Sequence, residues 1–409
     1  MERHRSGEVL AVWASVGLVF LLCGPWVLTN DKLYHQLIIF LLWLPALLAL
    51  LRDDLRQGLK KPEWLLFAAF MLWTWVVIAV EGGDDAVGKI KVTLYVALTL
   101  AGTLLAARNQ RWQIETLLLC SSVFGGLLAA VSWAWFLTGA PQTMGYRVVA
   151  LGLWDTIIMA AHAVGALAVL GVYLLKIRWL SWRGASWLLL PVLGYALFLG
   201  FSQTRGVWTA LLASLLVMAV ARPSKAGTSL IILVVICTVG VLVFSPDTLL
   251  QRGFSYRDTL WNGGIGLLRQ HWETGMGFHE YSILVPETGQ SFKHPHNLFI
   301  DTGVRLGMPG LLLFGALWLT VGWRGWRSRA QPLGRALLAL WVFSSVSLMT
   351  DGIGLWLKPN ADWLITWLPI GLSLVLSCRE SIGTSPKSTL THLPCITEEA
   401  ASSRESDRL

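Results

Sequence analysis

Charged residues are scarce in this sequence. Asp, Glu, Lys and Arg make up 14% of its 409 residues, whereas hydrophobic side chains make up 55%. Because soluble domains carry about 25% charged residues, this composition excludes an ordinary water-soluble protein and indicates a chain whose solvent is largely lipid. No stretch long enough to form a separate soluble domain remains between the hydrophobic segments.

Cysteine chemistry and a cleavable export signal are also missing. The five cysteines show neither CxxC nor Cys/His ligand spacing, which excludes a disulfide framework and a structural zinc site of the usual kind. The first hydrophobic run has no small-residue cleavage site after it, so we interpret it as a membrane span and not as a signal peptide. The polar, Ser/Thr-rich segment 379–409 is predicted to be a disordered cytoplasmic tail without chemistry.

Hydrophobic runs of membrane-spanning length are abundant. Twelve are predicted, at 9–29, 35–51, 64–80, 92–107, 117–138, 156–175, 186–202, 206–221, 228–244, 308–323, 336–350 and 363–378. The sequence therefore predicts an all-α integral membrane protein of about twelve transmembrane helices. Residues 1–378 would form one polytopic domain, with 245–295 as a large external loop that contains short helices.

Lysine and arginine predict the orientation. If both termini and the even-numbered connections share one side, that side holds 21 of the chain's 32 Lys and Arg residues. The positive-inside rule makes this side cytoplasmic and the loop 245–295 external. Because the basic residues lie in short loops beside spans, we attribute the net charge of +8 to topology and expect no nucleic-acid partner.

Within the external loop, the stretch SYRDTLWN predicts a helix. Ser255 and Asp258 have the spacing of a capping box, so the helix is expected to start near Tyr256 and to end near 273–277. This start places Arg257 in the first turn, where unpaired backbone N–H groups and a guanidinium together favour phosphate oxygens.

Two further helix starts are predicted on the same face. Arg205 stands at the external start of the eighth span, and His296 and Asn297 open the helix that leads into the tenth span. Three positive helix ends on one face predict an anion site at the membrane surface. The alternative is that these arginines only contact lipid headgroups. Gly307 and Gly310 are expected to allow a turn between a short helix and the tenth span.

The spacing around His296 resembles that of a known family. His296-Asn297, nine residues, Gly307, two residues and Gly310 fit the pattern H-[N/S/Q]-x9-G-x-x-[G/T/Y] of the O-antigen ligases and related bacterial O-oligosaccharyltransferases. About twelve spans, cytoplasmic termini, a large periplasmic loop before the tenth span, and the arginines at 205 and 257 extend the resemblance.

The resemblance implies a GT-C-like fold and a reaction at the periplasmic leaflet of a Gram-negative inner membrane. Such enzymes transfer a polysaccharide from undecaprenyl pyrophosphate, the donor, to a sugar hydroxyl of lipid A–core, the acceptor. They use no cofactor and no metal. Membrane lipids are the other expected partners, and the oligomeric state, the glycan and the acceptor sugar stay open.

The residue types present suit this chemistry. A neutral imidazole can take the proton of a weakly nucleophilic alcohol, so His296 is the predicted general base, and positively charged surroundings would keep it neutral. A departing pyrophosphate needs fixed cations, which Arg205 and Arg257 would supply. With no carboxylate nucleophile evident, displacement with inversion is expected. Possible supporting residues are Asn297, His294, Lys293 and Arg147.

Other polar residues are expected to have structural roles. Asp301 and Arg305 have the i,i+4 spacing of an ordinary ion pair. The carboxylates Glu81, Asp84 and Asp85 are the alternative, as a metal site, but we favour a solvated turn. Four histidines have no partner visible in the sequence and are predicted to have packing or interface roles, namely His35, His162, His271 and His279.

Three functions remain open at this point. The ligase is preferred. An O-antigen polymerase or a protein O-oligosaccharyltransferase would use the same donor with another acceptor. A non-catalytic transporter of polyprenyl-linked glycolipids belongs to a different class, and such a protein is expected to place ionisable residues at mid-membrane and to have broken, paired helices. These spans are nearly free of charge.

Overall fold

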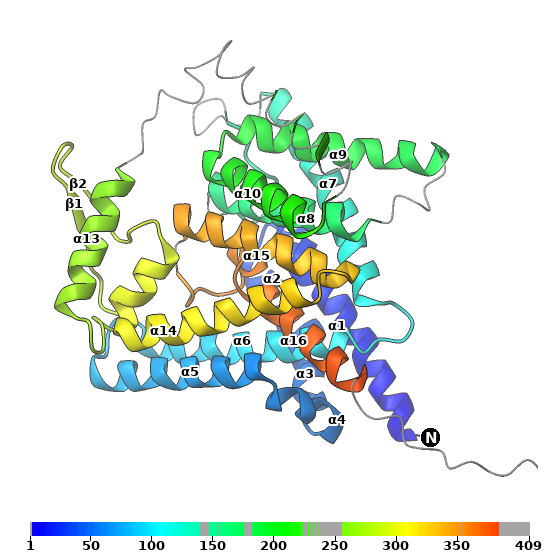
Figure 1. The fold of residues 1–409 in the computed structure, drawn as a ribbon, viewed down its shortest axis with the longest axis horizontal. Helices are drawn as coiled ribbons and strands as arrows, with labels where there is room; N and C mark the ends of the chain where they lie inside the picture. Colours follow the sequence, from blue (N-terminus) through cyan, green and yellow to red (C-terminus); the bar gives the residue numbers. More distant parts are fainter. Residues whose placement is uncertain are drawn as a thin grey trace, which may run out of the picture.

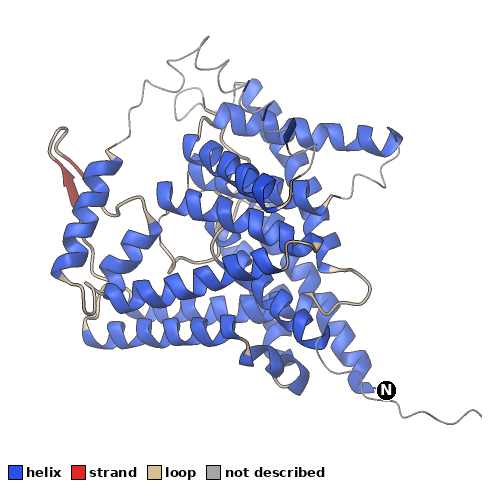
Figure 2. Cartoon of the chain, in the orientation of Figure 1, coloured by secondary structure: helices blue, strands red, loops and turns tan. Residues whose placement is uncertain are grey.

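The protein is helical almost throughout, as expected for a chain whose backbone must satisfy its own hydrogen bonds in lipid (Figures 1 and 2). The computed structural model describes residues 2–139, 147–154, 156–175, 182–223, 256–352 and 354–383, with isolated positions at 228, 229, 232 and 236. Apart from these isolated positions, the predicted ninth span 228–244 lies outside the described residues, as do the loop segment 245–255 and the tail after Gly383.

Helices account for nearly all of the named elements. In chain order they are α1 (Glu2–Val27), α2 (Asp31–Ile38), the π-helix η1 (Ile39–Trp43), α3 (Leu44–Ala49), α4 (Asp53–Arg56), the 3-10 helix η2 (Gln57–Lys60), α5 (Pro62–Val80), α6 (Ala86–Ala106), α7 (Ile114–Leu137), α8 (Ile157–Leu174), α9 (Trp182–Ser202), α10 (Arg205–Ala221), α13 (Arg257–Gln270), α14 (Leu298–Arg327), α15 (Pro332–Asp351), the 3-10 helix η4 (Ala361–Leu364) and α16 (Trp367–Gly383).

The all-α membrane architecture is confirmed. Nine segments of the described chain are long and apolar enough to span a membrane, and two shorter apolar helices, Ser186–Ser202 and Arg205–Ala221, match the predicted seventh and eighth spans. These eleven helices correspond to eleven of the twelve predicted runs. The exact count and the GT-C likeness stay predictions.

The centre of the bundle is the segment Ala361–Glu380, which combines η4 with most of α16. Of its membrane-length apolar window, 94% is buried inside the protein. It packs against α6, α14 and α15. Tight helix contacts elsewhere use small residues, as is usual in membranes. At Gly194 of α9, for example, a Cβ atom would lie 2.1 Å from the carbonyl oxygen of Gly126 in α7.

Helix α14 is broken at Gly307, which has φ 66° and ψ −173°. The predicted turn between a short helix and the tenth span is thus confirmed at Gly307, whereas Gly310 is helical. Groups freed by the break find partners in the protein: the Leu306 carbonyl accepts from Trp73 Nε1 at 2.9 Å, and the Met308 N–H donates to the Trp272 carbonyl at 2.7 Å. A side chain at 307 would meet the Glu273 carbonyl, so only glycine fits.

The described part of the loop 245–295, which is predicted to be external and is called the external loop below, lies at the end of the bundle where α14 begins (left in Figure 1). It consists of α13 and an antiparallel hairpin of β1 (Ile283–Val285) and β2 (Gln290–Phe292), with Ile283 opposite Phe292. The expectation of short helices alone was therefore incomplete. Loop and bundle share a small second core of Leu260, Leu268, Tyr281, Ile283, Val285 and Val304.

Candidate active site

Three helices begin close together at this end of the bundle, and each is preceded by a left-handed residue. Gln203 (φ 51°), Tyr256 (φ 58°) and His296 (φ 50°) come just before α10, α13 and α14. For residues with a side chain this conformation costs on the order of 1–3 kcal/mol, and it is concentrated at functional sites. It turns the chain sharply into each helix, so that Arg205 and Arg257 occupy the first helical position.

Helices α10 and α13 have no side-chain cap. The residues before them, Thr204 and Tyr256, make no capping hydrogen bond to the first turn. The predicted helix start near Tyr256 is confirmed, because Tyr256 is the N-cap residue of α13. Ser255, on which the predicted capping box depends, lies outside the described residues. Helix α13 also ends at Gln270, earlier than predicted. In the first turn of α10, the Val207 N–H donates to the Thr204 carbonyl at 3.0 Å, and the anion site at these helix starts stays a prediction.

Helix α14 differs from these two. Its N-cap is Asn297, whose Oδ1 accepts from the N–H groups of Phe299 at 3.0 Å and Ile300 at 3.2 Å. The helix start at His296–Asn297 is confirmed, but the first turn of α14 is already occupied by its own cap. The three helix starts are therefore not equivalent: Asn297 acts as the cap of α14, and the anion site stays a prediction.

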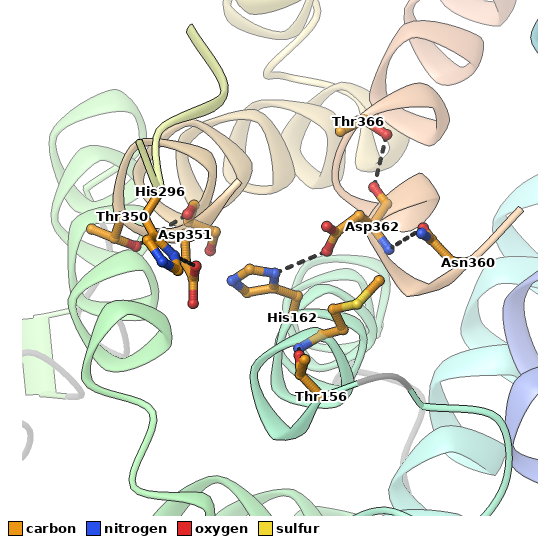
Figure 3. Close-up of polar contacts among 10 residues, drawn as sticks. Thr156, His162, His296, Thr350, Asp351, Asn360, Asp362 and Thr366 are labelled. Carbon is orange, nitrogen blue, oxygen red and sulfur yellow. Dashed lines mark hydrogen bonds and ion pairs between the residues drawn. The ribbon is translucent and has the colours of Figure 1, made fainter. Parts of the chain in front are cut away.

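His296 contacts a carboxylate and not a group of cations. Its Nδ1 lies 2.5 Å from Oδ1 of Asp351, the last residue of α15 (Figure 3). The positively charged surroundings expected for His296 are therefore wrong at this nitrogen. The carboxylate accepts from Nδ1–H, which leaves the Nε2 lone pair as a proton acceptor. Nε2 makes no hydrogen bond within the part of the chain that the structure describes, and the His296 side chain is 26% exposed.

Thr350, next to Asp351, connects the two predicted arginines to this pair. Arg257 donates from Nε to the Thr350 carbonyl at 2.8 Å, and its terminal Nη groups make no hydrogen bond within the described chain. Helix α10 packs along α15, and a Cβ atom at Gly206 would lie 2.6 Å from Thr350 Oγ1. The residue after Arg205 thus lies directly against Thr350, so the structure brings the starts of α10 and α13 to the same end of α15.

Arg147 supports the turn before α10. Its Nε donates to the Ser202 carbonyl at 2.7 Å, and Nη2 donates to Thr204 Oγ1 at 3.3 Å. These bonds link the segment before α8 to the turn between α9 and α10. The position of Arg147 therefore fits a residue that orients the start of α10.

The two other residues predicted to support the site differ in position. The ring of His294 stacks edge-on against His296 with centroids 4.2 Å apart, and its Nδ1 accepts from the His296 N–H at 3.4 Å. Burial, and then the adjacent His296 ring, lower the pKa of His294. Lys293 is exposed, and its Nζ forms an ion pair with the Glu280 carboxylate at 3.1 Å. Its partner is therefore a residue of the external loop.

The predicted Asp301–Arg305 ion pair is confirmed, with Nε 3.1 Å from Oδ2. Asp301 is fully buried and also accepts from the Tyr281 hydroxyl at 2.5 Å. Burial, followed by the charge of Asp301, raises the pKa of Tyr281, so its hydroxyl stays a donor. The hydrogen bond from Tyr281 to Asp301 fastens the external loop to the first half of α14.

The carboxylates considered for a metal site hold the loops together. Glu81 Oε1 accepts from Thr274 Oγ1 at 2.6 Å, and Asp84 Oδ2 accepts from the backbone of Glu280 at 3.2 Å. Gly83 pairs with Phe278 in an isolated bridge. The EGGDD turn is therefore packed against the external loop and is less solvated than predicted.

A second histidine–aspartate pair lies behind the first. His162 Nδ1 of α8 is 3.0 Å from Asp362 Oδ1 of η4, and both side chains are almost fully buried (Figure 3). His162, for which no partner is visible in the sequence, thus has one 200 positions away, in addition to its place in the packed core. Sequence reasoning missed Asp351, His162 and Asp362. The available signal was that each is an ionisable residue in or beside an otherwise apolar span.

Comparison with known proteins agrees with the resemblance seen in the motif. Residues 148–315 match the family model described as O-antigen ligase, a segment that includes Arg205, Arg257 and His296. Over 394 residues the chain is 24% identical to the O-antigen ligase of Pseudomonas aeruginosa, and the alignment covers 94% of this chain and 95% of that protein.

Proposed function

Because residues 148–315 match the O-antigen ligase family model and the chain is similar to an O-antigen ligase over most of its length, we propose that it belongs to this family and transfers O-antigen polysaccharide from undecaprenyl pyrophosphate to a sugar hydroxyl of lipid A–core. The reaction takes place at the periplasmic face of the inner membrane, with the termini in the cytoplasm. The observation that carries the proposal is the His296–Asp351 contact directly beside the Arg257–Thr350 contact. A base and a phosphate-binding cation are thus held by consecutive residues of α15.

In the proposed step, His296 Nε2 removes the proton from the acceptor hydroxyl as its oxygen attacks the anomeric carbon of the donor sugar. Asp351 holds the Nδ1–H tautomer and stabilises the imidazolium that forms. The bond from the anomeric carbon to the phosphate oxygen breaks, and its electron pair leaves with undecaprenyl pyrophosphate. Because attack and departure occur on opposite faces, the anomeric configuration inverts.

The departing pyrophosphate gains negative charge on the oxygen that linked it to the anomeric carbon. Arg205 and Arg257 occupy the first position of helices without a side-chain cap, where a guanidinium fork and backbone N–H groups would meet the same anion. Such preorganised groups stabilise developing charge in the transition state more than the ground state. The step therefore requires no cofactor and no nucleotide sugar.

A transporter is supported less well. Transporters place ion and substrate sites in broken helices, and α14 is broken at Gly307. Here, however, the Leu306 carbonyl and the Met308 N–H at the break are bonded to Trp73 and Trp272 and do not line a path. The polar groups of the site gather instead at the ends of helices on one face.

The function is tested by reconstituting the purified protein with a defined undecaprenyl-pyrophosphate glycan and two acceptors, lipid A–core and the glycan's own repeat unit. We expect transfer to lipid A–core. Elongation of the repeat unit would instead identify a polymerase. Movement of the donor across the bilayer without transfer to either acceptor would identify a transporter and overturn the proposal.

A further inference from the structure

The proposed base stands in a strained turn. His296 has φ 50°, a left-handed conformation that residues with a side chain rarely adopt. Pro295 directly before it has a fixed φ and no N–H, and Asn297 directly after it is extended, with φ −149°. The direction of the His296 ring toward Asp351 depends on this abrupt change of the backbone. Because the conformation is unfavourable in itself, surrounding contacts have to stabilise it.

His294 provides such contacts from two residues away. Its Nδ1 accepts from the His296 N–H at 3.4 Å, which closes the turn in the manner of an Asx turn, where a side-chain acceptor binds the N–H two residues on. The same ring lies edge-on against the His296 ring, with centroids 4.2 Å apart and an interplanar angle of 62°. One side chain thus contacts both the backbone and the imidazole of the proposed base.

Two other side chains contact the His296 ring. Phe292 lies edge-on against it with centroids 5.8 Å apart, and Asp351 Oδ1 lies 2.5 Å from its Nδ1. Among the hydrogen bonds of the described chain, the partner of the His296 N–H is His294. Phe292 and Asp351 therefore restrain the ring, whereas His294 also binds the backbone that directs it.

The hydrogen bond requires an unprotonated Nδ1 on His294. Burial, followed by the adjacent His296 ring, lowers the pKa of His294, so this ring is neutral near pH 7 and carries its proton on Nε2. His296 has the opposite tautomer in the proposed mechanism, because Asp351 accepts from its Nδ1–H. The two neighbouring histidines are therefore distinguishable by the nitrogen that holds the proton.

We propose that His294 is a positioning residue of the ligation site: its Nδ1 and its ring together hold His296 in the left-handed turn that directs the base. The inference rests on the proposed function of His296, and it gives His294 a role through that residue and not a contact with donor or acceptor. Catalysis by a positioned group is sensitive to displacements of about 1 Å. Loosening the turn should therefore slow the reaction without weakening the binding of either substrate.

Three variants at this position divide the contact into its parts. Asn can place its Oδ1 close to the position of the His Nδ1, so His294→Asn keeps the acceptor and removes the ring. His294→Phe keeps a ring and removes the acceptor, and His294→Ala removes both. In the reconstituted ligation we expect kcat of His294→Ala to fall about 10- to 100-fold, with KM for donor and acceptor unchanged. His294→Asn should recover most of this loss and His294→Phe only a part.

A double variant tests whether His294 acts through the base. If it does, its removal has no further effect once the base is gone, so His294→Ala/His296→Ala should react at the residual rate of His296→Ala. A second readout is 15N NMR of the histidine-labelled protein, in which His294→Ala should lose the single Nδ1–H form of His296. His271→Asn, which replaces an exposed histidine after α13, is the matched control and should keep the wild-type kcat.

The outcomes separate this inference from the proposed function. Wild-type kcat in folded His294→Ala, with an inactive His296→Ala, would overturn the inference alone. A raised acceptor KM in His294→Ala, or a further loss of rate in the double variant, would show a direct substrate contact and would also overturn it. Full activity of His296→Ala would overturn the proposed base itself. If His294→Ala does not accumulate, a higher kcat in His294→Asn than in His294→Phe would support the inference, and equal values would overturn it.

Discussion

Arg257 donates from Nε to the carbonyl of Thr350, the residue directly before Asp351. This contact ties the start of α13 in the external loop to the end of α15, where Asp351 holds His296. The proposed phosphate-binding group and the proposed base therefore share one anchor. A shift of α15 by a fraction of a turn would displace both, and catalysis by positioned groups is sensitive to displacements of about 1 Å.

Replacing Asp351 by Asn should reduce ligation strongly. The amide is nearly isosteric but neutral, and it can donate to Nδ1, which favours the wrong imidazole tautomer and leaves the imidazolium without its counter-charge. We expect kcat to fall about 10²-fold or more, within the range typical for loss of general-base function. Glu280→Gln, which breaks only the exposed Lys293 pair, is the control. Normal turnover in Asp351→Asn would contradict the role given to this carboxylate.

Arg205→Lys and Arg257→Lys should each impair the reaction, because an ammonium group cannot reproduce the bidentate guanidinium fork. We expect donor KM to rise and kcat to fall, together about tenfold or more in kcat/KM for a charge-assisted contact. Arg269 lies on the same helix as Arg257 but is exposed in the last turn. The control variant Arg269→Lys should therefore keep the wild-type kcat and donor KM. Normal transfer in the double variant Arg205→Lys/Arg257→Lys would remove the proposed anion site.

Asn297→Ala separates a capping role from a ligand-binding role. The side chain caps α14 through two backbone N–H groups, and loss of such a cap costs about 1 kcal/mol. We therefore expect a lower Tm in detergent with donor KM unchanged. A raised donor KM at unchanged Tm would show instead that Asn297 contacts the substrate.

His294 should make stability sensitive to mild acid. Its pKa is lowered in the fold, by burial first, so the unfolded chain binds a proton there more readily than the folded protein does. Its contribution is fully present above its ordinary pKa of 6.5 and is lost as the pH falls below that value. His294→Gln should therefore lose less thermal stability than the wild type between about pH 7 and 5.5. An identical decrease in both proteins would contradict this assignment.

Local sequence patterns predicted the features that depend on neighbouring residues. The start of α14 at Asn297, the break at Gly307 and the Asp301–Arg305 pair all follow from spacings of a few residues. The membrane-spanning segments followed from hydropathy because lipid imposes one length and one composition on them.

The parts of the site that were missed depend on contacts between distant segments. His296 meets Asp351 across 55 positions, and His162 meets Asp362 across 200. The hydrophobic periodicity of the sequence does not predict such pairs, because they depend on how distant helices pack together. The hairpin β1–β2 was missed because strands of three residues carry too little alternation to be distinguished from loop.

The most direct measurement is the single-turnover rate of ligation by purified His296→Ala, with donor binding measured in parallel. The account predicts a rate reduced about 10²–10⁴-fold, the usual range for loss of a general base. Donor binding should stay close to that of the wild type, because Arg205 and Arg257 are unchanged. A near-normal rate in this variant would show that His296 is not the base, and would leave its contact with Asp351 as a structural feature of the loop.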